Sequence, residues 1–277
     1  MHRWLIKMLR CIDVRVIYCF SAIFVIPVCL MVNPSRRVIY RYMRQRQGYG
    51  RFKAAWSTYR NHCLFGQVVI DRFAMWAGKR FQVEVEGSDH FNNLVGKKEG
   101  FIQMSAHIGN YELAGYTLCS DRKQFNALVY GGEKPSVVAN RQKMFAANNI
   151  NMIAVSPDMR HLFEINSALA TGQIVSLPAD RLLGSDKSIE ADFLGAKALF
   201  PYGPFSIATM RSLEVIAVNV VKTGTKKYKI IITPLRYDTG APRREQVIQL
   251  NTAFVSELER VVKMYPTQWY NFYEFWK

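Results

Sequence analysis

The stretch GFIQMSAHIGNYELAGYTLCS, residues 100–120, decides the fold. Its first half is a short apolar run that ends at His107, and its second half, from Tyr111, has the composition of a helix. In α/β proteins whose strands turn into helices in this way, the working residues gather outside the carboxyl ends of the strands. His107, and Glu112 five residues later, therefore occupy a position at which chemistry is expected.

Outward from this stretch, short strands and helices alternate along the chain, which is typical of βαβ units. The pattern predicts an α/β fold: a single domain with a mixed, mainly parallel sheet flanked by helices, preceded by a membrane-associated helical segment. Strands are predicted at 80–87, 100–107, 125–131, 150–156, 173–180 and 228–235, helices at 36–77, 136–149, 159–172 and 244–264, and one further helix and strand within 205–224.

Positive charge is concentrated at the N-terminus. The chain of 277 residues has a formal net charge of +16, and residues 1–60 hold twelve Lys and Arg against the single acid Asp13. The rest of the chain has an ordinary balance. A local basic cluster of this size indicates a polyanionic partner, either anionic lipid headgroups or nucleic acid.

The uncharged run VIYCFSAIFVIPVCLMV, residues 16–32, lies within this basic region. Its 17 residues are at the lower limit for crossing a bilayer, where about 20 are usual. If the run crosses the bilayer, the more basic flank after it places the main body of the protein in the cytoplasm. A segment that lies within the cytoplasmic leaflet fits the two basic flanks equally well. We therefore predict a membrane-associated segment at 1–35 and a catalytic domain at 36–277. The five cysteines show no metal-ligand spacing, and we expect reduced thiols.

The residue types of the opening stretch suit acid–base chemistry. A neutral imidazole takes a proton from a hydroxyl near neutral pH. A carboxylate about one helical turn away would hold the ring of His107 in one tautomer and stabilise the imidazolium. Gly109 allows close approach of substrate or backbone, and Asn110 is placed to cap the helix that follows.

Three blocks of sequence resemble one family. SAHIGNYELAG, residues 105–115, resembles the H-x-x-x-x-[DE] block of the lysophospholipid acyltransferase superfamily, and its H-x-G-N-[WY]-E form is similar to the lipid A biosynthesis (lauroyl/myristoyl-type) branch. Residues 178–208 and the closing YPTQWYNFYEFWK, residues 265–277, are similar to later blocks of that branch, in the same order. In the tail, Tyr273 and Glu274 stand where the family usually has a basic pair.

The resemblance implies a membrane-bound acyltransferase of the cell inner membrane, working at its cytoplasmic face. It would move a fatty acyl chain from a thioester of acyl carrier protein or coenzyme A to a hydroxyl of a lipid acceptor, lipid A or a related envelope lipid. In that reaction His107 would act as general base and Glu112 would orient it. We also expect an anionic membrane surface as a partner, and we expect no cofactor, metal or nucleic acid.

The resemblance also suggests a substrate-binding set. Arg181, with Lys197, would hold an acceptor phosphate, because arginine favours bidentate contacts with such groups. A surface salt bridge is an equal alternative for Lys197, and Asp180 has a structural alternative in fixing Arg181. Gly203 would form a turn near the thioester, or a plain turn before a helix. The predicted binding residues are Asn110, Asp180, Arg181, Lys197 and Gly203.

Other readings fit parts of the sequence. An acyltransferase of the same fold acting on a lysophospholipid, an amino-acid lipid or a pigment would carry the same motif. A basic protein that binds anionic membranes or nucleic acid explains the charge but not the position of His107. The chain lacks H-E-x-x-H, G-x-S-x-G and P-loop motifs. The aromatic residues of the tail would line an acyl groove, meet the membrane interface or pack in the core.

Overall fold

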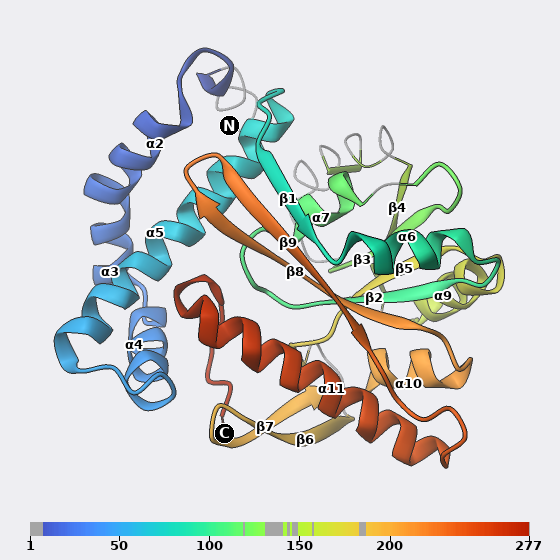
Figure 1. Ribbon diagram of the computed structural model, residues 1–277. Helices are drawn as coiled ribbons and strands as arrows, with labels where there is room; N and C mark the ends of the chain where they lie inside the picture. Colours follow the sequence, from blue (N-terminus) through green and yellow to red (C-terminus); the bar gives the residue numbers. More distant parts are fainter. Residues whose placement is uncertain are drawn as a thin grey trace.

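The computed structural model describes residues 8–118, 120–130, 141, 142, 145, 149–156, 158–182 and 187–276. Within these residues a seven-stranded sheet lies at the centre, with helices on both faces and a helical arm along one side (Figure 1). The predicted helix at 136–149 lies mostly outside the described residues.

The sheet has the strand order β1-β9-β8-β2-β5-β3-β4, and every neighbouring pair is parallel except β8 and β9. This confirms the predicted mixed, mainly parallel α/β fold. β2 lies near the centre, and all five of its side chains are buried because both faces of the sheet are covered. The strands are β1 (Gln82–Glu86), β2 (Phe101–Ser105), β3 (Phe125–Tyr130), β4 (Ile150–Val155), β5 (Ile174–Pro178), β8 (Val215–Gly224) and β9 (Lys227–Leu235).

Two hydrophobic clusters lie on opposite faces of this sheet, because successive side chains of a strand point to opposite sides. Phe101 and Ile174 face the cluster that includes α6 (Ser88–Gly96) and α7 (Tyr111–Thr117). Ile102 and Val175 face the larger cluster, which includes side chains of the remaining helices of the domain. These are α9 (Arg160–Ala170), α10 (Tyr202–Met210) and α11 (Arg243–Met264).

A two-stranded antiparallel hairpin was not predicted from the sequence. Its strands are β6 (Ser188–Phe193) and β7 (Ala196–Pro201), and Leu194 and Gly195 turn between them with positive φ angles of 51° and 75°. A glycine in a two-residue turn between alternating runs is a recognised hairpin signal. The hairpin packs against α11 and buries Phe193 and Phe200 in the larger cluster.

The N-terminal region is an arm of helices. A continuous helix covers Val14–Val32 and is assigned as α2 (Val14–Phe20), the π-helical turn η1 (Ser21–Val25) and α3 (Ile26–Val32). α4 (Ser35–Gln45) and the 26-residue α5 (Arg51–Trp76) follow, so the stretch predicted as helical at 36–77 is divided into two helices by residues 46–50. In Figure 1 α5 lies between the Val14–Val32 helix and the sheet. The Val14–Val32 helix is long and apolar enough to cross a membrane, by length and composition alone.

The aromatic tail after α11 belongs to the core. Trp269, Tyr270 and Phe275 are at most 7% exposed, and Trp269 and Phe275 join the larger hydrophobic cluster. Tyr42 of α4 packs edge-on against Trp269, with ring centroids 5.3 Å apart. Core packing is therefore the role that the structure gives these three side chains.

Candidate active site

His107 and Asp180 follow two neighbouring strands. β2 ends at Ser105 and β5 ends at Pro178, and these two residues are paired in the parallel ladder. Asp180 Oδ2 accepts a hydrogen bond of 2.9 Å from the His107 backbone N–H, and Asp180 Oδ1 lies 2.7 Å from His107 Nδ1. The histidine and this carboxylate, 73 residues apart in sequence, thus meet at the carboxyl edge of the sheet.

The pair has a defined electrostatic character. Burial by itself raises the pKa of the Asp180 carboxyl, but the charge and hydrogen bonds of His107, together with the charge of Arg181, outweigh it and leave that pKa below its ordinary value. An ionised carboxylate only accepts hydrogen bonds, so the Nδ1 atom of His107 carries the proton. When the ring is neutral in this tautomer, its Nε2 atom is an acceptor, which is what a general base requires.

A glycine fixes the turn after His107. Gly109 has φ +52°, and a Cβ atom there would lie 1.9 Å from the carbonyl oxygen of Val220. The Gly109 N–H donates to the Gln268 carbonyl at 2.9 Å, and the Tyr270 N–H donates to the His107 carbonyl at 2.9 Å. The C-terminal segment therefore runs beside the turn after His107 and holds its backbone in place.

Glu112, in the first turn of α7, contacts two arginines. Its Oε1 atom lies 2.8 Å from Arg141 Nη2 and 3.3 Å from Arg72 Nη1. The side chains of Glu112 and Arg141 are 4% and 6% exposed. Arg72 also lies over the ring of Tyr111, 4.9 Å from its centroid. One carboxylate is therefore shared by two guanidinium groups, that of the buried Arg141 and that of the partly buried Arg72.

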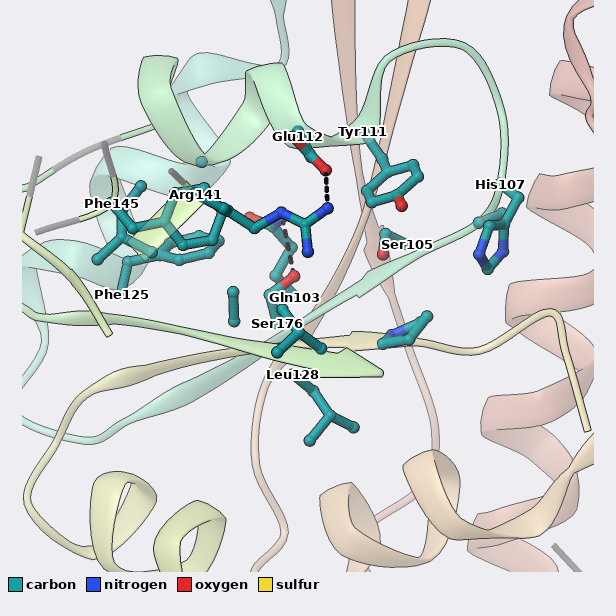
Figure 2. Close-up of a pocket in the computed structure, with 16 residues that line it drawn as sticks. Gln103, Ser105, His107, Tyr111, Glu112, Phe125, Leu128, Arg141, Phe145 and Ser176 are labelled. Atoms are coloured by element: carbon teal, nitrogen blue, oxygen red, sulfur yellow. Dashed lines mark hydrogen bonds and ion pairs between the residues drawn. The ribbon is translucent and has the colours of Figure 1, made fainter. Parts of the chain in front are cut away.

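His107 and Glu112 line the same cavity, which has a volume of about 120 Å³ (Figure 2). Polar side chains, among them Ser105, His107 and Tyr111, border one part of it, and apolar side chains border the rest. The apolar part is lined by Gly115, Phe125, Ala127, Leu128, Phe145 and Ile150, among others. A polar centre joined to an apolar recess suits a substrate with a reactive head and a hydrocarbon portion.

The model of one protein family matches residues 68–277 of this chain, and that family is described as bacterial lipid A biosynthesis acyltransferase. This range includes every residue of the cavity. The chain belongs to this acyltransferase family.

Two further comparisons concern curated proteins and solved structures. No curated protein matches the acyltransferase chain. The crystal structure of the 1-acyl-sn-glycerophosphate (LPA) acyltransferase PlsC from Thermotoga maritima aligns at 17% sequence identity with a TM-score of 0.43, covering 98% of this chain and 100% of that one.

In this acyltransferase, the carboxylate that contacts the histidine differs from the predicted one. The sequence placed Glu112 there, because five residues between strand end and first helical turn bring the two close. Among the described contacts, the carboxylate at His107 Nδ1 is Asp180, and Glu112 is engaged by Arg141 and Arg72. The contact with His107 Nδ1 that the sequence assigned to Glu112 is thus made by Asp180, and the orienting role of such a contact stays a prediction.

Two members of the predicted binding set lie elsewhere in the acyltransferase. Lys197, on the exposed hairpin, pairs with Asp192 at 3.0 Å and borders a groove beside α11. The salt-bridge alternative that the sequence offered for Lys197 thus has a partner in Asp192. Gly203 lies in the first turn of α10, has open space around it and does not line the His107 cavity.

Of the remaining three members, Asp180 contacts His107 as described above, and Arg181 and Asn110 lie beside the turn after His107. Arg181 donates from Nη2 to the Tyr270 carbonyl at 2.7 Å, and its guanidinium carbon lies 5.8 Å from the Tyr273 ring centroid. Asn110 is at the N-cap of α7 but makes no capping hydrogen bond through its side chain. Its amide is fully buried and has no hydrogen-bond partner among the described residues.

Sequence reasoning missed the two arginines that contact Glu112 in the acyltransferase. Arg72 lies on α5, 40 residues before Glu112, and Arg141 is 29 residues after it, so no local motif joins the three. The available signal was Glu112 itself, because a carboxylate in an otherwise largely apolar helix indicates a cationic partner. Among the described residues, no group of three or more His, Cys, Asp or Glu is arranged to hold a metal ion.

Proposed function

We propose that this acyltransferase moves a fatty acyl chain from an acyl thioester to a hydroxyl group of lipid A or a related envelope lipid, with His107 as the general base. The observation that carries the proposal is the contact between His107 Nδ1 and the buried carboxylate of Asp180, at a cavity with an apolar recess. A histidine held in this tautomer directs a basic Nε2 atom toward a substrate.

The proposed reaction has two proton transfers. His107 Nε2 takes the proton of the acceptor hydroxyl while its oxygen attacks the thioester carbonyl. The tetrahedral intermediate then collapses, the carbon–sulfur bond breaks, and the imidazolium returns the proton to the leaving thiolate. The products are an ester and a free thiol. Asp180 stabilises the imidazolium that exists between the two transfers.

Guanidinium groups stand close to the cavity, because Arg141 lines it and Arg72 contacts Glu112. Groups of this kind attract anionic parts of a donor or acceptor. We propose that Arg181, next to the turn after His107, contacts an acceptor phosphate. Lys197 has no part in this proposal, because it borders a different groove.

The donor is proposed to be a thioester of acyl carrier protein or of coenzyme A. Both are cytoplasmic molecules, so we place the enzyme at the cytoplasmic face of the inner membrane. The family acts on lipid and the chain has an apolar N-terminal helix, and together these features indicate membrane association. The basic N-terminal region supports contact with an anionic membrane surface.

The direct test is acyl transfer from labelled acyl carrier protein and from acyl coenzyme A to a lipid A precursor. We expect wild type to transfer from at least one donor, and His107→Ala to lose at least about 100-fold. His90→Ala is the matched control, because His90 is an exposed residue of α6, and it should retain full activity. Normal transfer by a folded His107→Ala protein would refute the proposed base.

The acceptor is identified by mass spectrometry of total lipids from cells with and without the gene. Loss of one acyl group from lipid A would support the proposal. Loss of a phospholipid, amino-acid lipid or pigment ester would name that acceptor instead, and would refute the lipid A part while leaving the chemistry at His107 in place.

A further inference from the structure

The helix Val14–Val32 has an exposed apolar stripe along its whole length. Six large apolar side chains recur at spacings of four, three, one, four and three residues, which places them on one helical face. Each is between 52% and 66% exposed. An apolar face of this length in water requires a cover. The stripe consists of Val16, Phe20, Ile23, Phe24, Val28 and Met31.

The opposite face of the same helix is attached to α5. The Tyr59 hydroxyl donates to the Ala22 carbonyl at 3.0 Å. A methyl group on Gly66 would lie 3.4 Å from Ile26 Cδ1, so the two helices touch there. α2, η1 and α3 all contact α5, so the helix is packed along its length and does not extend away from the domain.

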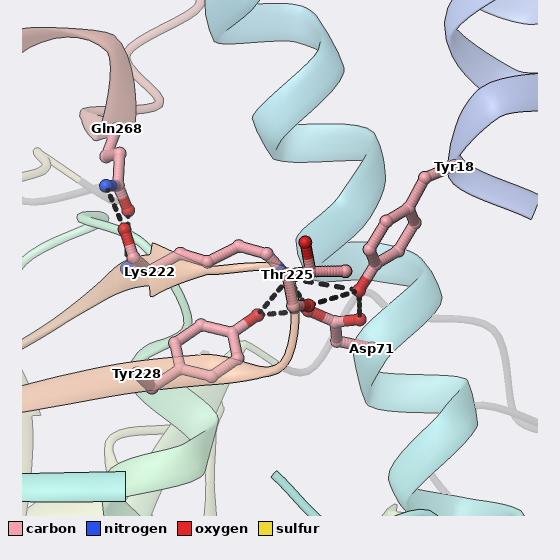
Figure 3. A network of polar contacts seen from close by, with 6 residues as sticks. All are labelled: Tyr18, Asp71, Lys222, Thr225, Tyr228 and Gln268. Carbon is pink, nitrogen blue, oxygen red and sulfur yellow. Dashed lines mark hydrogen bonds and ion pairs between the residues drawn. The ribbon is translucent and has the colours of Figure 1, made fainter. Parts of the chain in front are cut away.

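A buried polar network joins the helix, α5 and the sheet (Figure 3). The Tyr18 hydroxyl donates to the carboxylate of Asp71, which also accepts from the Tyr228 hydroxyl and pairs with Lys222. Lys222 Nζ donates to the Tyr18 oxygen at 3.0 Å. The side chains of Asp71 and Lys222 are 0% and 3% exposed. Removing the helix would take away the Tyr18 hydroxyl from this network and open the ion pair to solvent.

This attachment conflicts with a spanning helix. Its 19 residues are about 28 Å long, close to the roughly 30 Å of the hydrocarbon core. If it crossed, α5 beside it would enter the core as well. α5 carries exposed Arg51, Lys53 and Arg60 and is joined to the sheet at Asp71. Charged side chains are rare in lipid, and a sheet edge there would lack hydrogen-bond partners.

We propose that the Val14–Val32 helix lies within a single leaflet of an anionic bilayer, with the apolar stripe toward the acyl chains and α5 on the water side. The proposal rests on the membrane association in the proposed function and adds its geometry.

The charges at the two ends of the helix fit the same leaflet. Basic residues precede it and follow it, as expected if both ends meet one layer of phosphate headgroups. A groove of about 670 Å³ between α3, α4 and α5 has no acidic residue in its lining and offers guanidinium groups to such headgroups. The exposed basic residues before and after the helix include Arg10, Arg15, Arg37, Arg41 and Arg44, and Arg36, Arg37 and Arg41 line the groove.

Depth measurement tests the geometry directly. The full-length protein with a single cysteine at Val16→Cys, Phe24→Cys or Met31→Cys is spin-labelled and reconstituted in phosphatidylethanolamine–phosphatidylglycerol vesicles. A helix in one leaflet predicts similar depths for the three labels. A spanning helix predicts a label at the bilayer centre for position 24 and labels about 10–12 Å nearer opposite surfaces for the other two, and that result would overturn the proposal.

An independent test asks on which side of the membrane the N-terminal end of the helix lies. A variant that keeps only Cys11 of the native cysteines is treated with a membrane-impermeant maleimide in inside-out and right-side-out vesicles. We expect labelling on the same face as a control that lacks the native cysteines and carries Thr252→Cys, an exposed position of α11. Labelling of Cys11 from the opposite face would overturn the proposal. Neither readout uses acyl transfer, so failure of the proposed reaction is recognised separately.

Discussion

Replacing Asp180 by asparagine tests which carboxylate serves His107. The amide of the Asp180→Asn variant would keep an oxygen that accepts from the His107 N–H, now 2.9 Å from Asp180 Oδ2, so the backbone of the turn should persist. In that orientation the NH2 group takes the place of the other carboxylate oxygen, which is 2.7 Å from His107 Nδ1, so the amide presents an N–H donor there. A donor there moves the ring proton to Nε2, and in that tautomer the ring cannot accept a proton from the substrate.

We expect Asp180→Asn to lower kcat by about 10²–10⁴-fold, the usual contribution of general base catalysis. This corresponds to about 2.7–5.4 kcal/mol of barrier. KM for the acceptor should change little, because the effect falls on proton transfer. The assay is acyl transfer, combined with nitrogen-15 NMR of labelled histidine to read the His107 tautomer.

Glu112→Gln provides the comparison. It removes the carboxylate from two buried arginines, so we expect a lower melting temperature together with lower turnover, and an unchanged His107 tautomer. The reasoning would be refuted if Asp180→Asn kept its rate while Glu112→Gln lost rate and shifted the tautomer without loss of stability. That outcome would return the orienting role to Glu112.

Three further predictions concern stability. Gly109→Ala should destabilise the fold by about 1–3 kcal/mol or more, because its methyl would collide with the Val220 carbonyl, whereas Gly203→Ala, with open space around it, should leave the melting temperature unchanged or slightly higher. Lys222→Met should lower the free energy of unfolding in urea by about 3–5 kcal/mol, because it leaves Asp71 buried without its cation. A smaller loss in the Asp71→Leu, Lys222→Met double variant would confirm that the unpaired charge is responsible, and an equal loss would contradict it. The folded-state pKa of Asp180 is lowered, so the stability advantage of wild type over Asp180→Asn should be complete above the ordinary aspartate pKa of about 3.9 and should shrink as pH falls below it. A difference in unfolding free energy that does not change between pH 3 and 6 would contradict this.

Local patterns predicted most of the elements, because burial on two sheet faces imposes short apolar strands between amphipathic helices. The fully buried β2 and the long helix α11 were both recognisable in this way. The hairpin of β6 and β7 was not predicted, although residues of alternating burial flank Leu194 and Gly195 on both sides. The family resemblance of residues 178–208 carries no information about their local structure. α6, of nine residues, was missed as well, since a short helix between two strands has little periodicity to detect.

The sequence by itself determined the fold class, the family and the position of His107 after a buried strand, because hydrophobic period, turn chemistry and motif are local properties of the chain. Strand order is not local. It places β5 beside β2, and only this pairing brings Asp180 to His107. In the same way the apolar run at 16–32 was visible as a membrane-seeking segment, but its attachment to α5 through Tyr18 and Asp71 depends on side chains 53 residues apart. Contacts of this kind are decided by how the elements pack in three dimensions, which spacing along the chain does not encode.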